Sequence, residues 1–258
     1  MILLKNIHKL FTMGPQGILE GIDVLVDGKK IVKIGKDIKV EGNVEVIDAT
    51  NKYVYPGFID AHCHIGLFEE AIGFEGNDGN EITNPITPEL RAIDAINPMD
   101  ISFKEALMGG VTTASTGPGS ANVLGGQFTI IKLAGRRVDD MIVKAYSAMK
   151  CAFGENPKRC YRGKGPETRM ATAAKLREML FKAKEYMEKK EKDDESKKPD
   201  FNIQYEALIP LLKREVPLKA HAHRADDIFT SIRIAKEFNL LLTLDHCTEG
   251  HLVADILA

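Results

Sequence analysis

The sequence predicts an α/β fold in which a parallel barrel follows a small β-rich segment. Short strand-like runs fill residues 1–53, and from residue 54 strand-like runs alternate with helical ones. Such alternation is typical of a parallel sheet covered by helices. Histidines recur at the ends of the later runs, which in a parallel barrel open on the face where active sites are built. We therefore expect two domains, residues 1–53 and residues 54–258.

The first domain is expected to be a small β-sandwich or part of one. Apolar runs at 22–26 and 31–35 flank the sequence Asp27-Gly28-Lys29-Lys30. An Asp-Gly pair between two strand-like runs is a strong hairpin signal. A further short strand is expected at 44–48.

The second domain is expected to contain about six strands and at least three helices. The strands are predicted at 58–64, 111–116, 129–133, 142–149, 218–221 and 240–246. Helices are predicted at 101–108, before Gly109-Gly110, at 167–192, where apolar residues recur every three or four positions, and from Asp226 to about Phe238. Right-handed crossovers between parallel strands then align their carboxyl ends.

The barrel is expected to be incomplete. Subtracting the first 53 residues from 258 leaves 205, whereas a complete eight-stranded barrel takes about 250. With six strands predicted, we expect the last two strand–helix units to be missing. Open sheet edges would then favour association, so a homo-oligomer is expected.

Composition excludes several classes of partner. The net charge is −2, with 35 basic and 37 acidic residues, which gives no support for binding nucleic acid or an anionic membrane. No apolar run approaches the ~20 residues needed to span a bilayer. The first residues are too charged for a secretory signal, and the four cysteines form no Cys-x-x-Cys pair. A cytoplasmic protein acting on a small molecule is therefore expected.

Two histidine pairs indicate a metal centre. His62 and His64 end an apolar run, and residues two apart on a strand point to the same side, so both imidazoles can converge while Cys63 faces away. His221 and His223 end another run, and His246 ends a third. Neutral imidazoles gathered on one face are suitable ligands for a transition metal. Histidines satisfied by hydrogen bonds in polar turns are the alternative interpretation.

Three motifs resemble those of the amidohydrolase superfamily, with the imidazolonepropionase-like branch nearest. They are PGFIDAHCHIG at 56–66, HAHRADDI at 221–228 and TLDHCTEG at 243–250, in this order after a β-rich segment. The resemblance implies a distorted (β/α)8 TIM barrel joined to a small β-sandwich. It also implies hydrolysis of C–N bonds, in cyclic amides, amidines or dipeptides, with one or two divalent metal ions.

The resemblance further implies a role for individual residues. His62 and His64 match the ligands of the first barrel strand, His221 that of the fifth and His246 that of the sixth. A carboxylate bridging two metals would come from Glu155, which we prefer, or from a carboxylated Lys150. Zn²⁺ is the expected ion, and Mn²⁺, Fe²⁺ or Ni²⁺ would also fit.

The general base of the family is an aspartate on the eighth strand, which is expected to lie beyond the end of this chain. Asp245 precedes His246 and is expected to point to the opposite face. His223, Arg224 and Gln127 are candidate substrate contacts, Gln127 because it ends the glycine-rich segment 117–127. The alternative for the segment 117–127 is a plain connecting loop, and the alternative for His223 is a histidine that only supports a metal ligand. The rival function is a non-catalytic scaffold, or an inactive fragment, that acts through oligomer contacts.

Overall fold

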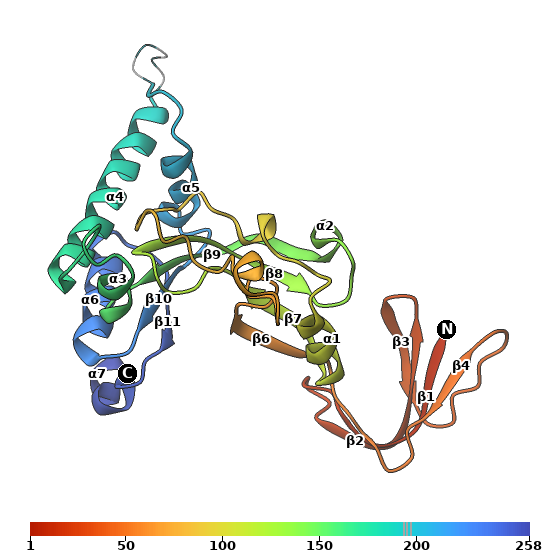
Figure 1. The fold of residues 1–258 in the computed structure, drawn as a ribbon. Coiled ribbons are helices and arrows are strands. Elements are labelled where there is room, and N and C mark those ends of the chain that lie inside the picture. Colours follow the sequence, from red (N-terminus) through yellow and green to blue (C-terminus); the bar gives the residue numbers. More distant parts are fainter. Residues whose placement is uncertain (193, 195, 197) are drawn as a thin grey trace. The chain divides into compact units, whose positions relative to one another are not determined.

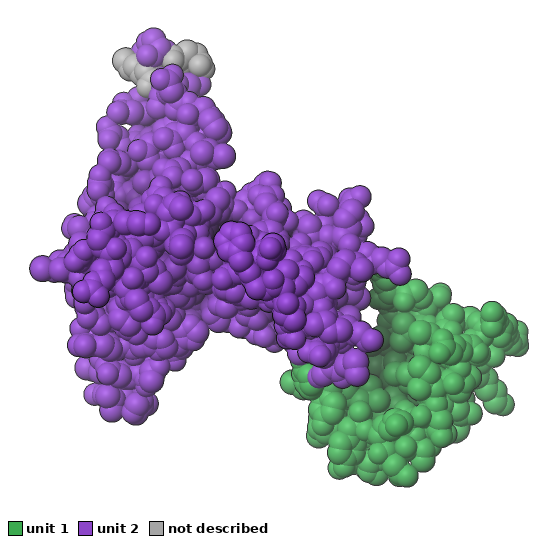
Figure 2. Space-filling view, viewed as in Figure 1, with its two compact units in different colours: residues 1–58 green, residues 59–258 purple. Residues whose placement is uncertain are grey.

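A computed structural model describes residues 1–192, 194, 196 and 198–258, and these form two compact units. The units are Met1–Phe58 and Ile59–Ala258, coloured separately in Figure 2. Within the described residues, no helix combines the length and the apolar character needed to cross a bilayer.

The first unit is built on one five-stranded sheet. Its strands are β1 (Ile2–Phe11), β2 (Ile18–Asp27), β3 (Lys30–Gly35), β4 (Glu45–Asp48) and β5 (Tyr53–Val54). They run in the order β3-β2-β1-β4, and β5 also pairs with β1. The predicted hairpin is confirmed, because Asp27 pairs with Lys30 across a two-residue turn in which Gly28 has a φ of 56°. The strands expected at 22–26 and 31–35 fall within β2 and β3, and the strand expected at 44–48 corresponds to β4.

The second unit contains a six-stranded sheet in the order β11-β10-β9-β8-β7-β6 (Figure 1). Its strands are β6 (Phe58–Cys63), β7 (Val111–Thr116), β8 (Leu124–Lys132), β9 (Ile142–Ala152), β10 (Leu218–Ala222) and β11 (Leu242–His246). The six predicted strands and the α/β class are confirmed.

The expectation of a wholly parallel sheet is wrong at β8. Strands β9, β10 and β11 pair in parallel, but β8 is antiparallel to both β7 and β9. The connections before and after β8 explain this, because a parallel crossover needs a dozen or more residues. Only 117–123 separate β7 from β8, and only 133–141, with the short helix α2 (Val138–Met141), separate β8 from β9. Residues 124–127, expected in a loop, belong to β8.

Helices cover one face of this sheet. The predicted helices correspond to α1 (Ile101–Met108), α4 (Arg169–Lys190) and α6 (Ala225–Glu237). Among the described residues, the short α2 and two longer helices, α3 (Glu155–Cys160) and α5 (Ile203–Leu212), were not predicted. The chain also forms α7 (Ala254–Leu257) and the 3₁₀ turns η1 (Gly73–Gly76), η2 (Ala92–Asp94) and η4 (Gly250–Val253).

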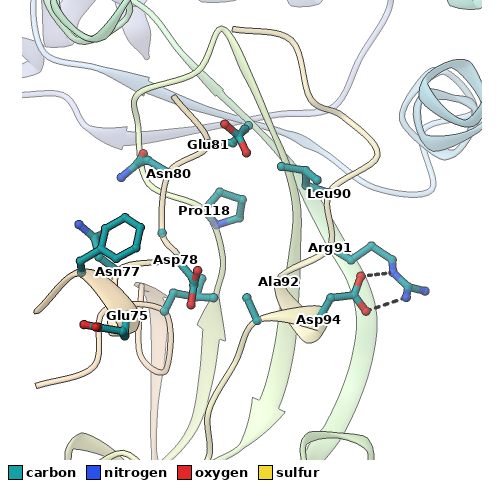
Figure 3. Close-up of a pocket in the computed structure, with 15 residues that line it drawn as sticks. Glu75, Asn77, Asp78, Asn80, Glu81, Leu90, Arg91, Ala92, Asp94 and Pro118 are labelled. Atoms are coloured by element: carbon teal, nitrogen blue, oxygen red, sulfur yellow. Dashed lines mark hydrogen bonds and ion pairs between the residues drawn. The ribbon is translucent and has the colours of Figure 1, made fainter. Parts of the chain in front are cut away.

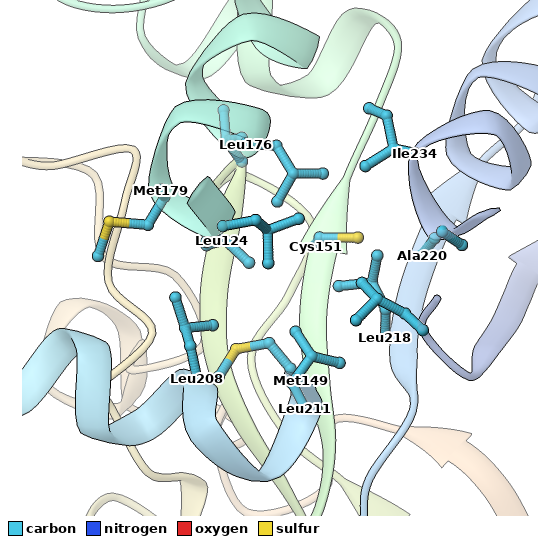
Figure 4. Packing of buried hydrophobic residues seen from close by; sticks show 14 of the residues in the cluster. Leu124, Met149, Cys151, Leu176, Met179, Leu208, Leu211, Leu218, Ala220 and Ile234 are labelled. Atoms are coloured by element: carbon cyan, nitrogen blue, oxygen red, sulfur yellow. The ribbon is translucent and has the colours of Figure 1, made fainter. Parts of the chain in front are cut away.

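The main core lies between this sheet and helices α4, α5 and α6 (Figure 4). Met149 and Cys151 of β9 and Leu218 and Ala220 of β10 point into it, together with Leu124 of β8. Because side chains alternate along a strand, the residues next to them, Lys150, Lys219 and His221, point to the opposite face. Packing of the apolar layer thus decides which polar side chains meet on the other side.

Gly154 makes the turn that leaves β9 toward α3. Its φ is 80°, and a Cβ there would lie 2.7 Å from Oδ2 of the buried Asp227. We expect Gly154→Ala to lower the free energy of unfolding by more than the roughly 1–2 kcal/mol typical of an L-residue with a left-handed backbone. Urea denaturation measures this. Gly163→Ala is the control, because Gly163 has a φ of 76° and nothing within 4 Å of its Cβ position; an equal loss in both variants would contradict the steric contribution.

Candidate metal centre

Five histidines lie next to one another at the ends of β6, β10 and β11. The ring centroid of His62 is 5.2 Å from those of His64 and His246, and His221 is 4.7 Å from His246. His223 is 4.6 Å from His221 and stacks on His246 at 5.2 Å. The four predicted histidine ligands and the predicted substrate contact His223 are thus brought together from three strands. Cys63 packs into a separate apolar cluster, as alternation predicted.

An ion-paired cluster lies beside these histidines. Lys150 Nζ is 2.7 Å from Asp245 Oδ2, Lys219 Nζ is 2.8 Å from Asp245 Oδ1, and His62 Nδ1 is 3.4 Å from Asp245 Oδ2. Both ammonium groups also approach the face of Phe128, at 5.8 and 5.4 Å from its centroid. Burial raises the pKa of Asp245, but the charges and hydrogen bonds of the two lysines outweigh it and hold that pKa below its ordinary value.

The expectation that Asp245 points away from the histidines is wrong. Leu242 and Leu244 pack against the apolar core, so alternation turns Asp245 toward Lys150 and Lys219. The strand ends at His246, whose φ is 70°. This left-handed backbone breaks the alternation, so two consecutive residues both lie beside His62.

Burial keeps the imidazoles neutral. It lowers the pKa of His62 to about 4 and that of His221 to about 3, and it also lowers the pKa values of His64 and His246. At neutral pH each ring therefore has one nitrogen with a free lone pair, the form that binds a metal. His64 Nδ1 lies 2.7 Å from the carbonyl oxygen of Gly117, to which it can donate. That contact leaves the lone pair of His64 on Nε2.

Several buried ring nitrogens have no hydrogen-bond partner. They are Nε2 of His62 and Nδ1 of His221. Nδ1 of His62 lies 3.4 Å from Asp245 Oδ2, within ion-pair distance but without hydrogen-bond geometry. An orphaned buried polar atom is costly, and such atoms are otherwise satisfied by protein, water or an ion. Among the described residues, no three His, Cys, Asp or Glu side chains are spaced as a closed metal site. The histidines are neighbours with free nitrogens, and the donor set suits a divalent transition metal.

The other predicted site residues lie elsewhere or face solvent. Glu155 begins α3, its side chain is 54% exposed, and its carboxylate is 3.8 Å from Arg169. Arg224 is exposed and pairs with Asp226 at 3.0 Å. Gln127 lies on β8 beside Phe128; since Phe128 stacks on His62, alternation places Gln127 on the other face.

Sequence reasoning missed three residues of this region. Lys219 and Phe128 could have been found by extending the alternation rule from His221 and into β8. Asn156 could not, because it reaches the site from α3, a helix of six residues with no periodic signal. Its side-chain Nδ2 is 3.1 Å from His221 Nε2.

A separate pocket of about 410 Å³ lies along the segment 67–95 (Figure 3). Acidic side chains gather around it, and Asp94 is paired with Arg91 through two contacts of 2.7 and 2.8 Å. Pro118, which follows the Gly117 that contacts His64, also lines the pocket. None of the predicted ligands or substrate contacts lines it.

Known proteins resemble this chain over most of its length. It is 30% identical over 265 residues to the amidohydrolase tasK of Hapsidospora irregularis, which covers 91% of this chain and 27% of that protein. It is 24% identical over 164 residues to imidazolonepropionase of Streptomyces griseus subsp. griseus, covering 60% of this chain and 42% of that enzyme.

A solved structure agrees over the whole chain. An amidohydrolase from Thermotoga maritima superposes with a TM-score of 0.92 at 44% identity, covering 100% of this chain and 67% of that one. No protein-family model matches the sequence. The chain thus spans less than half the length of these curated relatives, and two thirds of the solved one.

Proposed function

The chain belongs to the amidohydrolase superfamily, and on that premise we propose that it forms the metal-binding region of a hydrolase that cleaves C–N bonds. The observation that carries the proposal is the convergence of His62, His64, His221 and His246 from three strands. Their rings are neutral at pH 7, and Nε2 of His62 and Nδ1 of His221 are buried without a hydrogen-bond partner. These four side chains would hold one or two divalent ions, Zn²⁺ first and Mn²⁺, Fe²⁺ or Ni²⁺ as alternatives.

For the anionic ligand between two ions, the geometry favours Lys150 over Glu155. The Lys150 side chain is fully buried, and its ammonium charge acts on all four candidate ligands. The Glu155 carboxylate is half exposed and faces Arg169. Lys150 would need to gain a carboxyl group, and Lys219 would then remain to neutralise Asp245.

When bound, such an ion lowers the pKa of a water ligand toward 7 and polarises the carbonyl or imine carbon of the substrate. This chain's residues would bind the ion, orient its histidine ligands and contact the substrate. His64 is oriented by the Gly117 carbonyl, and His62 by Asp245. His223, whose Nδ1 is 2.6 Å from Thr248 Oγ1, lies next to His221 and His246 and can contact a substrate. A cyclic amide, an amidine or a dipeptide-like small molecule is the expected substrate class.

Metal titration tests the proposal. The chain, stripped with a chelator, is titrated with Zn²⁺ and Mn²⁺ by calorimetry, and bound metal is measured by elemental analysis. We expect saturable binding to the wild type that is strongly weakened in His62→Ala. His8→Ala, at an exposed position in the first unit, is the matched control and should bind as the wild type does. A folded chain that takes up neither ion would instead support the scaffold alternative.

A further inference from the structure

The amide of Asn156 is held between two side chains of opposite hydrogen-bonding character. Its Nδ2 is 3.1 Å from His221 Nε2, and its Oδ1 accepts from Arg159 Nη2 at 3.1 Å. Asn156 and Arg159 are three residues apart on α3, where side chains share a face. The backbone N–H of Phe153 donates to the carbonyl of His221 at 2.9 Å, which ties the start of this segment to β10.

These contacts determine which nitrogen of His221 carries the proton. A guanidinium only donates, so the amide oxygen must face Arg159 and the NH₂ group must face His221. The NH₂ group only donates, so His221 Nε2 must accept. A neutral imidazole with a lone pair on Nε2 carries its proton on Nδ1, and Nδ1 is the buried nitrogen that has no partner.

This arrangement is incompatible with a metal bound through Nδ1. Ligation there needs a lone pair on Nδ1, which moves the proton to Nε2 and makes Nε2 a donor toward Asn156. Two donors would then face each other at 3.1 Å. Rotation of the amide by half a turn relieves this, because it presents Oδ1 to Nε2–H, and it breaks the bond from Arg159.

We propose that Asn156 is the positioning residue of His221, and that its amide reverses when His221 binds a divalent ion through Nδ1. Only the part of this proposal that concerns the metal-bound state rests on the proposed function. Asn156 holds the ring in place in both states, and Arg159 favours the metal-free orientation. A partner on the non-ligating nitrogen commonly changes metal affinity by about 10–100-fold when it is removed.

The test begins with metal-free protein labelled with ¹⁵N-histidine, in which NMR at pH 8 identifies the protonated nitrogen of His221. The wild type is expected to carry the proton on Nδ1. Asn156→Asp presents a carboxylate oxygen both to Arg159 and to His221, so His221 should carry its proton on Nε2. A proton on Nε2 in the wild type, or no change in Asn156→Asp, would overturn the proposal.

The second measurement is Zn²⁺ affinity by chelator competition. Arg159→Met removes the group that opposes rotation and should bind about as tightly as the wild type or tighter, whereas Asn156→Leu should bind about 10–100-fold more weakly. Lys158→Met, on the same helix, is the control. Tighter binding by Asn156→Leu contradicts the proposal. The tautomer of the metal-free protein reports on Asn156 even if no ion binds, so failure of the proposed function is distinguishable from failure of this inference.

Discussion

Replacing Asp245 by Asn is expected to lower the free energy of unfolding of the metal-free chain by about 3–5 kcal/mol, the usual cost of removing one partner from a buried ion pair. The side chains of Asp245 and Lys150 are 4% and 0% exposed, and that of Lys219 is 10% exposed. Asparagine keeps the volume but leaves two ammonium groups beside Phe128 without an anion. Urea denaturation measures the loss.

Two further variants separate charge from packing. Asp139→Asn removes a carboxylate that pairs with Arg137 at the surface, where both side chains are more than 60% exposed, and should change stability by no more than about 1 kcal/mol. Adding Lys219→Met to Asp245→Asn removes one of the two unpaired ammonium charges and should recover part of the lost free energy of unfolding. If the two substitutions simply add their separate losses, the ion cluster does not act as a unit.

Most of the fold of the second unit follows from sequence periodicity. Apolar runs located all six strands, and the three-or-four spacing located α4. These signals come from burial on one face, except at β6, where Phe58 and Ile59 are exposed. The same periodicity does not indicate the direction of a strand. An antiparallel β8 has the same apolar pattern as a parallel one, and only the short connections on either side reveal it.

The candidate site, too, was predicted from the sequence only in part. The histidines two apart at the ends of β6 and β10 lie together as predicted, since strand alternation is local and regular. Asp245 was placed on the wrong face because the left-handed backbone of His246 interrupts that alternation. Nothing in the sequence indicates that this histidine has a positive φ. Glu155 was preferred as a bridging ligand from its position after a strand, but the chain enters α3 there and turns its carboxylate toward Arg169.

Lys150→Met is expected to reduce the metal affinity of the chain by at least about 10–100-fold, the loss seen even for residues that only support a ligand. Burial lowers the pKa of Lys150, although Asp245 opposes the effect, so the neutral amine becomes easier to reach. Neutral Nζ attacks CO₂, an N–C bond forms and one proton leaves, which gives a carbamate anion beside the histidine cluster. In ¹³C-bicarbonate, the metal-loaded wild type should therefore show a carbamate NMR signal that Lys150→Met lacks.

Glu155→Gln distinguishes the two candidates for the anionic ligand. It removes a half-exposed carboxylate at the start of α3, and if Lys150 provides the anion it should leave both the carbamate signal and the metal affinity unchanged. The opposite pattern, with metal lost in Glu155→Gln and retained in Lys150→Met, would assign the role to Glu155. That result would require α3 to move, because the Glu155 carboxylate now lies 3.8 Å from Arg169. Lys150, in contrast, is paired with the Asp245 carboxylate that also contacts His62, and it needs only CO₂ to become an anionic ligand.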